Sequence, residues 1–141
     1  MYEATTAAWQ AADLAILAAA VADMTPVSVA DHKMKKGQDL TDSIALRETQ
    51  DIARTLGENK RPDQTLVGFA LETDNEQLNA QKKLQSKHLD YIVMNSLREQ
   101  GAGFGTDTNS VTIFTNKGES HQLPLASKSQ IAEGILQTIR H

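Results

Sequence analysis

Short apolar runs alternate with helix-like segments along most of this chain, and this alternation limits the possible folds more than any other feature. Residues 65–72 (TLVGFALE) and 90–95 (DYIVMN) are typical of buried strands, and residues 14–22 form another continuous apolar run, as expected for a strand covered on both faces. The periodicity of residues 14–22 alone does not exclude a helix there. Strands that alternate with helices favour a three-layer α/β fold around a mainly parallel sheet.

Capping residues mark the starts of the predicted helices. Thr49 is the expected N-cap of a helix from about 50 to 56 that Gly57 closes. Two later helices open on capping boxes, in which a Ser or Thr precedes a Glu or Gln by three residues. These boxes pair Thr73 with Glu76, for a helix to about residue 88, and Ser127 with Gln130, for a helix to about residue 139. An alanine-rich helix over residues 2–13 is expected to precede them all.

The last third of the chain predicts an antiparallel hairpin. Residues 111–115 and 121–125 are strand candidates, and the turn between them falls at 116–118 (NKG). The preceding stretch, 96–109, is rich in glycine, and its GAGFG segment at 101–105 has the spacing of a dinucleotide-binding fingerprint. That fingerprint must open a helix directly after a strand, whereas here a strand follows. The segment is therefore predicted to be a loop.

Composition excludes several classes of protein. The chain of 141 residues has a formal net charge of −4 and no cysteine, so disulfide scaffolds and cysteine nucleophiles are excluded and nucleic acid is an unfavourable partner. We find no apolar run of about 20 residues and no leader-like start, so we expect a cytoplasmic protein without a membrane span. The four histidines lack partners at metal-binding spacing, and no metal site is predicted.

Polar residues that follow the predicted strands are the first candidates for binding. Asp23 and Asn95 each follow an apolar run, and ligands of open α/β sheets bind beyond the carboxyl ends of the strands. Two basic features stand out on this acidic chain, the cluster HKMKK at 32–36 and the pair Lys83 and Lys87, four residues apart on a predicted helix. An ordinary solvated surface is the simpler explanation for each feature alone. Together they favour a small anionic ligand.

Several segments in a fixed order resemble one enzyme family. They are AAVAD at 19–23, KMKK at 33–36, VGFALET at 67–73, Lys83 with Lys87, Asn95, and Gly103-Phe104 with Asp107 and Asn109. Together they resemble bacterial phosphopantothenate–cysteine ligase (phosphopantothenoylcysteine synthetase), often the C-terminal half of a bifunctional flavoprotein of coenzyme A biosynthesis. The resemblance implies a Rossmann-like (ribokinase-like) α/β/α fold with a C-terminal antiparallel hairpin. It also implies that residues 1–141 are one domain, the C-terminal portion of a ligase domain without its N-terminal strand and loop.

The resemblance further implies a ligase that joins 4′-phosphopantothenate to L-cysteine with CTP. The carboxylate of 4′-phosphopantothenate attacks the α-phosphate of CTP, and the amine of cysteine then displaces CMP from the acyl-cytidylate. Mg²⁺ would accompany the triphosphate, and FMN would belong only to a fused decarboxylase half that these residues do not include. The family also implies a homodimer, to which the apolar run at 14–22 is expected to contribute.

Residue roles follow from the same resemblance. Lys33 is implied as the catalytic residue that stabilises charge. The nucleotide-binding positions implied are Asp23, Lys33, Gln50, Asp51, Ile52, Ala53, Phe69, Lys83 and Lys87. The positions implied for substrate or intermediate are Ala19, Lys36 and Asn95. Thr49-Gln50-Asp51-Ile52 stands where the family has Asn-Pro-Asp-Ile, which makes the fit of that segment less close.

Three other interpretations remain open at the level of the sequence. The chain could be an inactive fragment that binds a nucleotide, a dinucleotide-binding oxidoreductase domain, or a module that only binds another protein. CTP binding without product favours the first, and tight NAD binding favours the second. The absence of any thermal shift with nucleotides favours the third.

Overall fold

The computed structural model describes residues 1–35, 43–71, 75–95 and 105–140. These residues divide into two compact units, which are described separately. The first unit comprises Met1–Ala19 and Ile52–His141, and the second comprises Ala20–Asp51.

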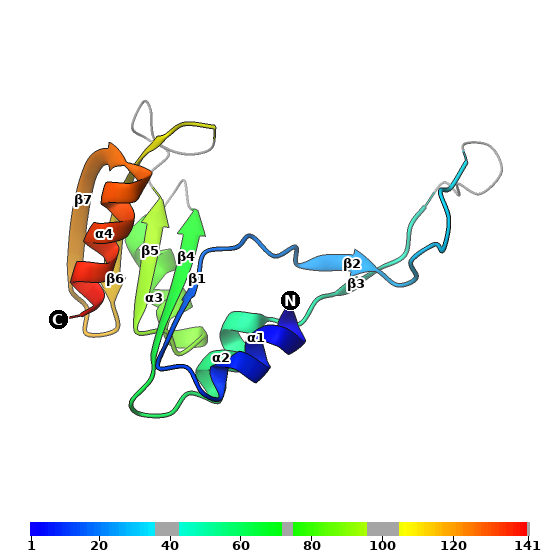
Figure 1. Cartoon of the computed structure of the whole chain (residues 1–141), viewed down its shortest axis with the longest axis horizontal. Helices are drawn as coiled ribbons and strands as arrows, with labels where there is room; N and C mark the ends of the chain where they lie inside the picture. Colours follow the sequence, from blue (N-terminus) through cyan, green and yellow to red (C-terminus); the bar gives the residue numbers. More distant parts are fainter. Residues whose placement is uncertain (36–42, 72–74, 96–104, 141) are drawn as a thin grey trace. The chain divides into compact units, whose positions relative to one another are not determined.

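A five-stranded sheet forms the centre of the first unit (Figure 1). Its strands, in spatial order, are β1 (Leu14–Leu17), β4 (Thr65–Leu71), β5 (Tyr91–Asn95), β6 (Thr108–Thr115) and β7 (Ser120–Ser127). The first three are parallel, and the last two form an antiparallel hairpin against β5. The predicted mainly parallel sheet with a C-terminal hairpin is therefore confirmed. Gly118 takes the hairpin turn with φ 88°, a conformation that favours glycine.

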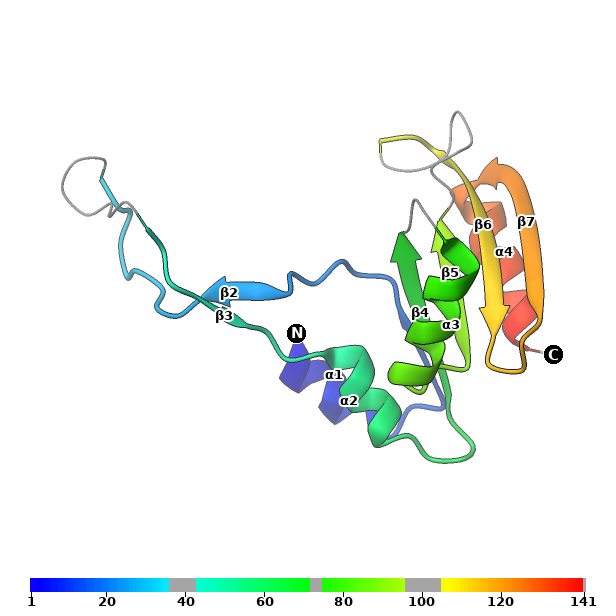
Figure 2. The same ribbon diagram turned by 180° about the vertical axis from the view of Figure 1, so that it is seen from behind.

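Helices cover both faces of this sheet, which confirms the three-layer architecture. They are α1 (Tyr2–Trp9), α2 (Ile52–Glu58), α3 (Glu76–Ser86) and α4 (Lys128–Ile139). Figure 2 shows α3 in front of the sheet and α4 behind it. Helix α3 packs on β5 and β6 from one side, whereas α4 packs on β6 and β7 from the other. None of the helices in the described segments is both long and apolar enough to cross a bilayer.

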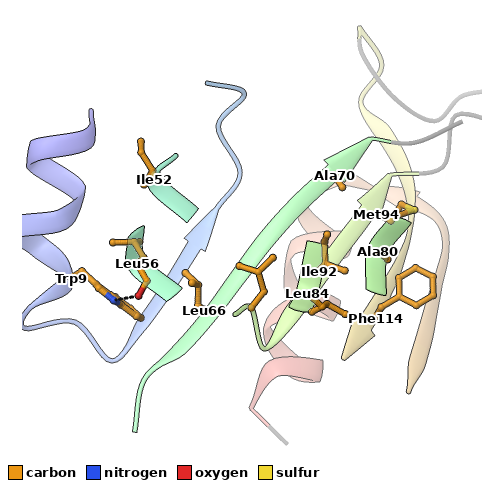
Figure 3. Packing of buried hydrophobic residues seen from close by; sticks show 11 residues of the cluster. Trp9, Ile52, Leu56, Leu66, Ala70, Ala80, Leu84, Ile92, Met94 and Phe114 are labelled. Atoms are coloured by element: carbon orange, nitrogen blue, oxygen red, sulfur yellow. Dashed lines mark hydrogen bonds between the residues drawn. The ribbon is translucent and has the colours of Figure 1, made fainter. Parts of the chain in front are cut away.

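Alternate residues of β4 and β5 enter two separate cores, one on each face. The core beside α1, α2 and α3 contains Trp9, Ile52, Leu56, Leu66, Ala70, Ala80, Leu84, Leu89, Ile92, Met94 and Phe114 (Figure 3). The core beside α4 contains Val67, Val93, Val111, Ile113, Ile131 and Ile135. A strand buried on both faces needs apolar side chains at every position, because successive residues point to opposite faces. This requirement explains the continuous apolar runs of β4 and β5.

Strand β1 is shorter and more exposed than the sequence suggested. It spans Leu14–Leu17, whereas the whole run 14–22 was predicted. Ala15 and Leu17 pack against the first core, but Leu14 and Ile16 are 40% and 37% exposed. The predicted burial on both faces is thus wrong for the described residues. The physical reason is that α4 covers β6 and β7, while β1 lies at the far edge of the sheet.

Two predicted helix starts also need correction. Helix α2 begins at Ile52, and the Thr49 hydroxyl donates instead to the carbonyl oxygen of Ala22 at 2.7 Å. Helix α3 has Asn75 as its N-cap with φ 49°, and Thr73 lies outside the described residues. The capping box of Ser127 and Gln130 is confirmed at the start of α4. A short polar side chain can bond the backbone in several ways, so a local pattern does not decide which bond forms.

The second unit is a thin antiparallel ribbon. Strand β2 (Met24–Pro26) pairs antiparallel with β3 (Leu46–Glu48). The backbone N–H of Thr49 donates to Asp23 O at 2.9 Å, which closes one end of the ribbon. Most of its described side chains are exposed, so hydrogen bonds rather than a buried core hold this unit together.

Candidate functional site

The carboxyl ends of β1, β4 and β5 lie at one edge of the sheet, because these strands are parallel. The antiparallel strand β6 begins at the same edge, where its first residues meet the end of β5. Open α/β sheets bind ligands at this edge. Of the polar residues that the sequence placed there, Asn95 is the last residue of β5. The edge is therefore the candidate functional site.

Asn95 is held by a second asparagine from the neighbouring strand. The side-chain amide of Asn109 donates from Nδ2 to Asn95 Oδ1 at 2.8 Å. The other end of the Asn109 amide, Oδ1, accepts the backbone N–H of Ser110 at 3.0 Å. Asn95 and Asn109 are both half-buried, whereas Ser110 is 1% exposed. The two amides thus form a short chain of hydrogen bonds from the strand backbone to the site.

Phe69 shares the sheet face of Asn95. In the register of β4 and β5, Leu71 pairs with Asn95, and Phe69 pairs with Val93. Residues two apart on a strand share a face, so Phe69, Leu71 and Asn95 all lie on the side of α4. The Phe69 ring is half-buried and packs against the core on that side. This face combines apolar surface with amide groups, which suits a ligand that has a flat or apolar part and oxygen acceptors.

Lys83 and Lys87 lie on the other side of the sheet. Lys83 belongs to α3, whose buried residues Ala80 and Leu84 enter the core opposite α4. Lys87 is the C-cap of α3, and β5 begins four residues later at Tyr91. Its backbone therefore lies near the amino ends of the strands. The structure brings Phe69 and Asn95 to one face and leaves both lysines on the other face.

The remaining predicted site residues divide between the two units. Asp23, Lys33, Gln50 and Asp51 belong to the second unit, where the first three are exposed. Ala19, Ile52 and Ala53 belong to the first unit. Ile52 is 9% exposed and fills the core beside α2, so its side chain serves packing. Lys36 and the segment 101–104 lie outside the described residues.

A hollow of about 650 Å³ lies at the opposite edge of the sheet, near the amino ends of β4 and β5. Asp63, Asp90, Tyr91, Asn116 and His121 are among the residues that line it. A side-chain hydrogen bond from Arg61 lowers the pKa of the Asp63 carboxyl there. The described residues bring no three His, Asp or Glu side chains together as a metal site.

The contact of Asn109 with Asn95 was not predicted from the sequence. Asn109 was part of the family resemblance, but it had no assigned contact. Asn109 and Asn95 are 14 residues apart and belong to different strands, so no local pattern reports their hydrogen bond. Its position at the start of the strand that pairs with β5 is the one signal that could have suggested it.

Comparisons with known proteins agree over nearly the whole chain. The family model described as "DNA/pantothenate metabolism flavoprotein C-terminal domain" matches residues 1–141. The coenzyme A biosynthesis bifunctional protein CoaBC of Bacillus subtilis is 50% identical over 139 residues, which are 99% of this chain and 34% of that protein. A protein named cysteine/cysteine sulfinic acid decarboxylase, from an unknown prokaryotic organism, is 48% identical over 139 residues, or 99% of this chain and 38% of that protein. The chain thus spans about a third of the length of these relatives.

Solved structures support the same assignment. The crystal structure of the C-terminal domain of CoaBC has a TM-score of 0.75 and 41% identity, and the match covers 99% of this chain and 61% of that chain. A Cab2 mutant in complex with phosphopantothenate-cysteine has a TM-score of 0.58 and 25% identity over 88% of this chain and 43% of that chain. By sequence and by fold, the chain belongs to the family of the DNA/pantothenate metabolism flavoprotein C-terminal domain.

Proposed function

We propose that this chain is part of a phosphopantothenate–cysteine ligase, which makes phosphopantothenoylcysteine in coenzyme A biosynthesis. The observation that carries the proposal is the match of 99% of the chain to the C-terminal domain of CoaBC, with a TM-score of 0.75. The phosphopantothenate-cysteine bound to the Cab2 mutant supports the choice of product. The proposal concerns the full-length protein, because the chain covers 61% of the CoaBC domain.

The proposed reaction has two steps. A carboxylate oxygen of 4′-phosphopantothenate attacks the α-phosphorus of CTP, and pyrophosphate leaves as the acyl-cytidylate forms. The amine nitrogen of L-cysteine then attacks the acyl carbon, loses a proton, and expels CMP as the amide bond forms. Both nucleophiles belong to substrates, so the protein contributes mainly by orienting them and stabilising developing charge.

Two described residues at the carboxyl edge of the sheet, Asn95 and Phe69, suit these tasks. Asn95 offers an amide to oxygen atoms of the nucleotide or the acyl-cytidylate, and Phe69 offers an aromatic ring on the same face. Lys33, on the ribbon of the second unit, is proposed to stabilise the negative charge that develops on the α-phosphate. Lys83 and Lys87 remain predicted contacts of the nucleotide.

In this scheme Mg²⁺ would bind together with the nucleotide triphosphate. It is bound in such enzymes through one or two carboxylates, substrate phosphates and water, and not by a dedicated cage of protein groups. Asp23 belongs to the ribbon that carries Lys33, and its exposed side-chain carboxylate is the described group proposed to hold it. Its chemistry would be to neutralise charge on the triphosphate. The preference for CTP, a homodimer and a cytoplasmic location stay predictions.

Product formation in the full-length protein tests the proposal. The assay mixes 4′-phosphopantothenate, CTP, Mg²⁺ and L-cysteine, and it follows pyrophosphate release together with the mass of the amide product. We expect Lys33→Gln to remove product formation. Lys117→Gln, the same change in the exposed turn of the β6–β7 hairpin, is the matched control and should retain activity.

Two outcomes would refute parts of the proposal. Absence of cysteine-dependent product from the wild-type protein would exclude the ligase. Full activity of Lys33→Gln would exclude its catalytic role and leave the ligase intact. Substituting ATP for CTP in the same assay measures the nucleotide preference. A thermal shift with CTP but no product would support the inactive nucleotide-binding fragment instead.

A further inference from the structure

We infer that Asn109 is a positioning residue that sets which end of the Asn95 amide faces the ligand. The inference rests on the proposed function, in which Asn95 contacts an oxygen-rich ligand. The structural basis is the chain of hydrogen bonds from Ser110 through Asn109 to Asn95 at the carboxyl edge of the sheet. Asn109 does not need to touch the ligand for this role.

The backbone fixes the direction of this chain. A backbone N–H can only donate, and that of Ser110 lies in a buried residue where an unmet donor is costly. The Asn109 atom at 3.0 Å from Ser110 N must therefore be the amide oxygen. Because the oxygen of Asn109 is used in this way, its NH₂ group is the end that faces Asn95.

The same logic orients Asn95. The NH₂ group of Asn109 requires an acceptor, so the Asn95 atom at 2.8 Å must be its oxygen. The NH₂ group of Asn95 is then the end left for a ligand, and it bonds to no acceptor in the described parts of the chain. Asparagine by itself could present either end. Here the backbone N–H of Ser110, two hydrogen bonds away, makes Asn95 present its NH₂ group to the ligand.

This polarity matters for the proposed chemistry. Carboxylate, phosphate and acyl-phosphate oxygens all accept hydrogen bonds, so an outward NH₂ group attracts them and an outward carbonyl oxygen repels them. The residue at position 109 therefore has to combine an acceptor for Ser110 with a donor for Asn95. Asparagine supplies both in one planar group, whereas aspartate supplies only acceptors when it is ionised.

Asn109→Asp in the full-length protein is the direct test. The carboxylate still accepts the Ser110 N–H, but its second oxygen draws the Asn95 NH₂ inward and turns the Asn95 carbonyl outward. We expect kcat/KM in the ligase assay to fall about 10- to 100-fold, the loss associated with one hydrogen bond to a charged group. Asn95→Asp keeps the bond from Asn109 and also presents an oxygen outward, so it should cause a similar loss.

The pH dependence of activity distinguishes a reversed Asn95 amide from a general disturbance of the site. Protonation of the carboxyl group introduced by Asn109→Asp restores a donor for Asn95, so the activity of this variant relative to wild type should rise about two- to tenfold between pH 7 and pH 5, the more the larger its loss at pH 7. About one molecule in ten is protonated one pH unit above the carboxyl pKa, which is enough to lift a low residual activity. Asn109→Ala cannot regain a donor, and its activity relative to wild type should stay level across the same range.

A double substitution tests whether Asn109 acts through Asn95. In an Asn95→Ala background, Asn109→Asp should lower kcat/KM by less than about twofold, because the group that it reorients is gone. Near-wild-type activity of Asn109→Asp, or an undiminished loss in the Asn95→Ala background, would overturn the inference. If Asn109→Asp fails to fold, Asn95→Asp and its pH profile decide the question, because that variant keeps the pair bonded.

A measurement without turnover distinguishes this inference from the proposed function. With ¹⁵N-labelled asparagine side chains in the same full-length protein, the Asn109 NH₂ should exchange with solvent more slowly than the Asn95 NH₂. The reverse order would overturn the inference even in an active ligase. The expected order in a protein without ligase activity would leave the polarity standing and remove only the proposed function.

Discussion

Lys60 Nζ lies 2.6 Å from Asp90 Oδ1 and 2.7 Å from Oδ2, and this half-buried ion pair joins the segment after α2 to the start of β5. Asp90 Oδ2 also accepts the backbone N–H of Leu66 at 2.8 Å, and Oδ1 accepts from Asn116 Nδ2 at 3.1 Å. One carboxylate thereby links β4, β5 and the turn after β6. This network of hydrogen bonds stabilises the amino edge of the sheet, whereas the candidate site lies at the carboxyl edge.

Asp90→Ala should destabilise the fold more than its partial exposure suggests. It leaves Leu66 N–H without its carboxylate partner and leaves Lys60 Nζ with the His88 carbonyl oxygen but no carboxylate, so we expect a loss of about 2–3 kcal/mol in the free energy of unfolding. The urea midpoint, followed by circular dichroism, measures the effect. Asp90→Asn retains an acceptor for Leu66 and should lose less. An unchanged midpoint for Asp90→Ala would contradict this account of the network.

Two glycines in helices should respond differently to substitution by alanine. Alanine favours a helix over glycine by about 1 kcal/mol at either site. At Gly57 in α2, however, an added Cβ would clash with the backbone carbonyl oxygen of Lys87, which cannot rotate away. We therefore expect Gly57→Ala to lower stability by about 1–3 kcal/mol.

Gly134 in α4 is the matched control for Gly57. An added Cβ there would lie 2.9 Å from Leu123 Cδ1, the end of a flexible and half-buried side chain. Gly134→Ala should stay within about 1 kcal/mol of wild type, because Leu123 can adopt another rotamer. Thermal melting of both variants makes the comparison. Equal losses at the two positions would show that the Lys87 carbonyl is not the deciding neighbour.

Trp9 should stabilise the packing of α1 on α2 and also report unfolding by its fluorescence. The indole is 3% exposed, and its Nε1 donates to the Leu56 carbonyl at 3.1 Å, which ties α1 to α2 (Figure 3). Trp9→Phe removes that bond and part of the ring, and we expect a loss of about 1–2 kcal/mol in the free energy of unfolding. As the single tryptophan of the chain, Trp9 reports unfolding by a red shift of its emission. An emission maximum already typical of exposed indole in the native protein would contradict its burial.

Ser127→Ala should weaken the start of α4 by about 1 kcal/mol, the usual cost of losing an N-cap. The Ser127 hydroxyl accepts from Gln130 N at 3.3 Å, and Gln130 Oε1 accepts the Ser127 N–H at 3.1 Å. Ser127→Asp keeps an acceptor and places negative charge at the helix start, so it should retain stability. Chemical denaturation of the two variants gives the comparison, and equal stability of both would argue against the cap.

Local chemistry made much of this fold predictable. The runs of β4 and β5 are apolar at successive positions because both faces of the sheet are covered, and such runs are visible in the sequence. The Ser127–Gln130 box spans three residues, so its geometry also follows from neighbours in the chain. The predictions were wrong where a residue could make several alternative contacts. Thr49 bonds Ala22 O rather than capping α2, and β1 lies at an edge where one of its faces is exposed.

The α/β class, the order of the main strands and the family to which the segments of Phe69 and Asn95 belong are all visible in the order of residues along the chain. Three relationships appear only in the folded chain: Asn109 bonds Asn95, Gly57 lies beneath the Lys87 carbonyl, and Lys83 lies across the sheet from Phe69. The two groups of features differ in how far apart along the sequence the interacting residues lie. Helix caps and strand patterns depend on residues a few positions apart, whereas these contacts depend on strand register and on which face each helix covers.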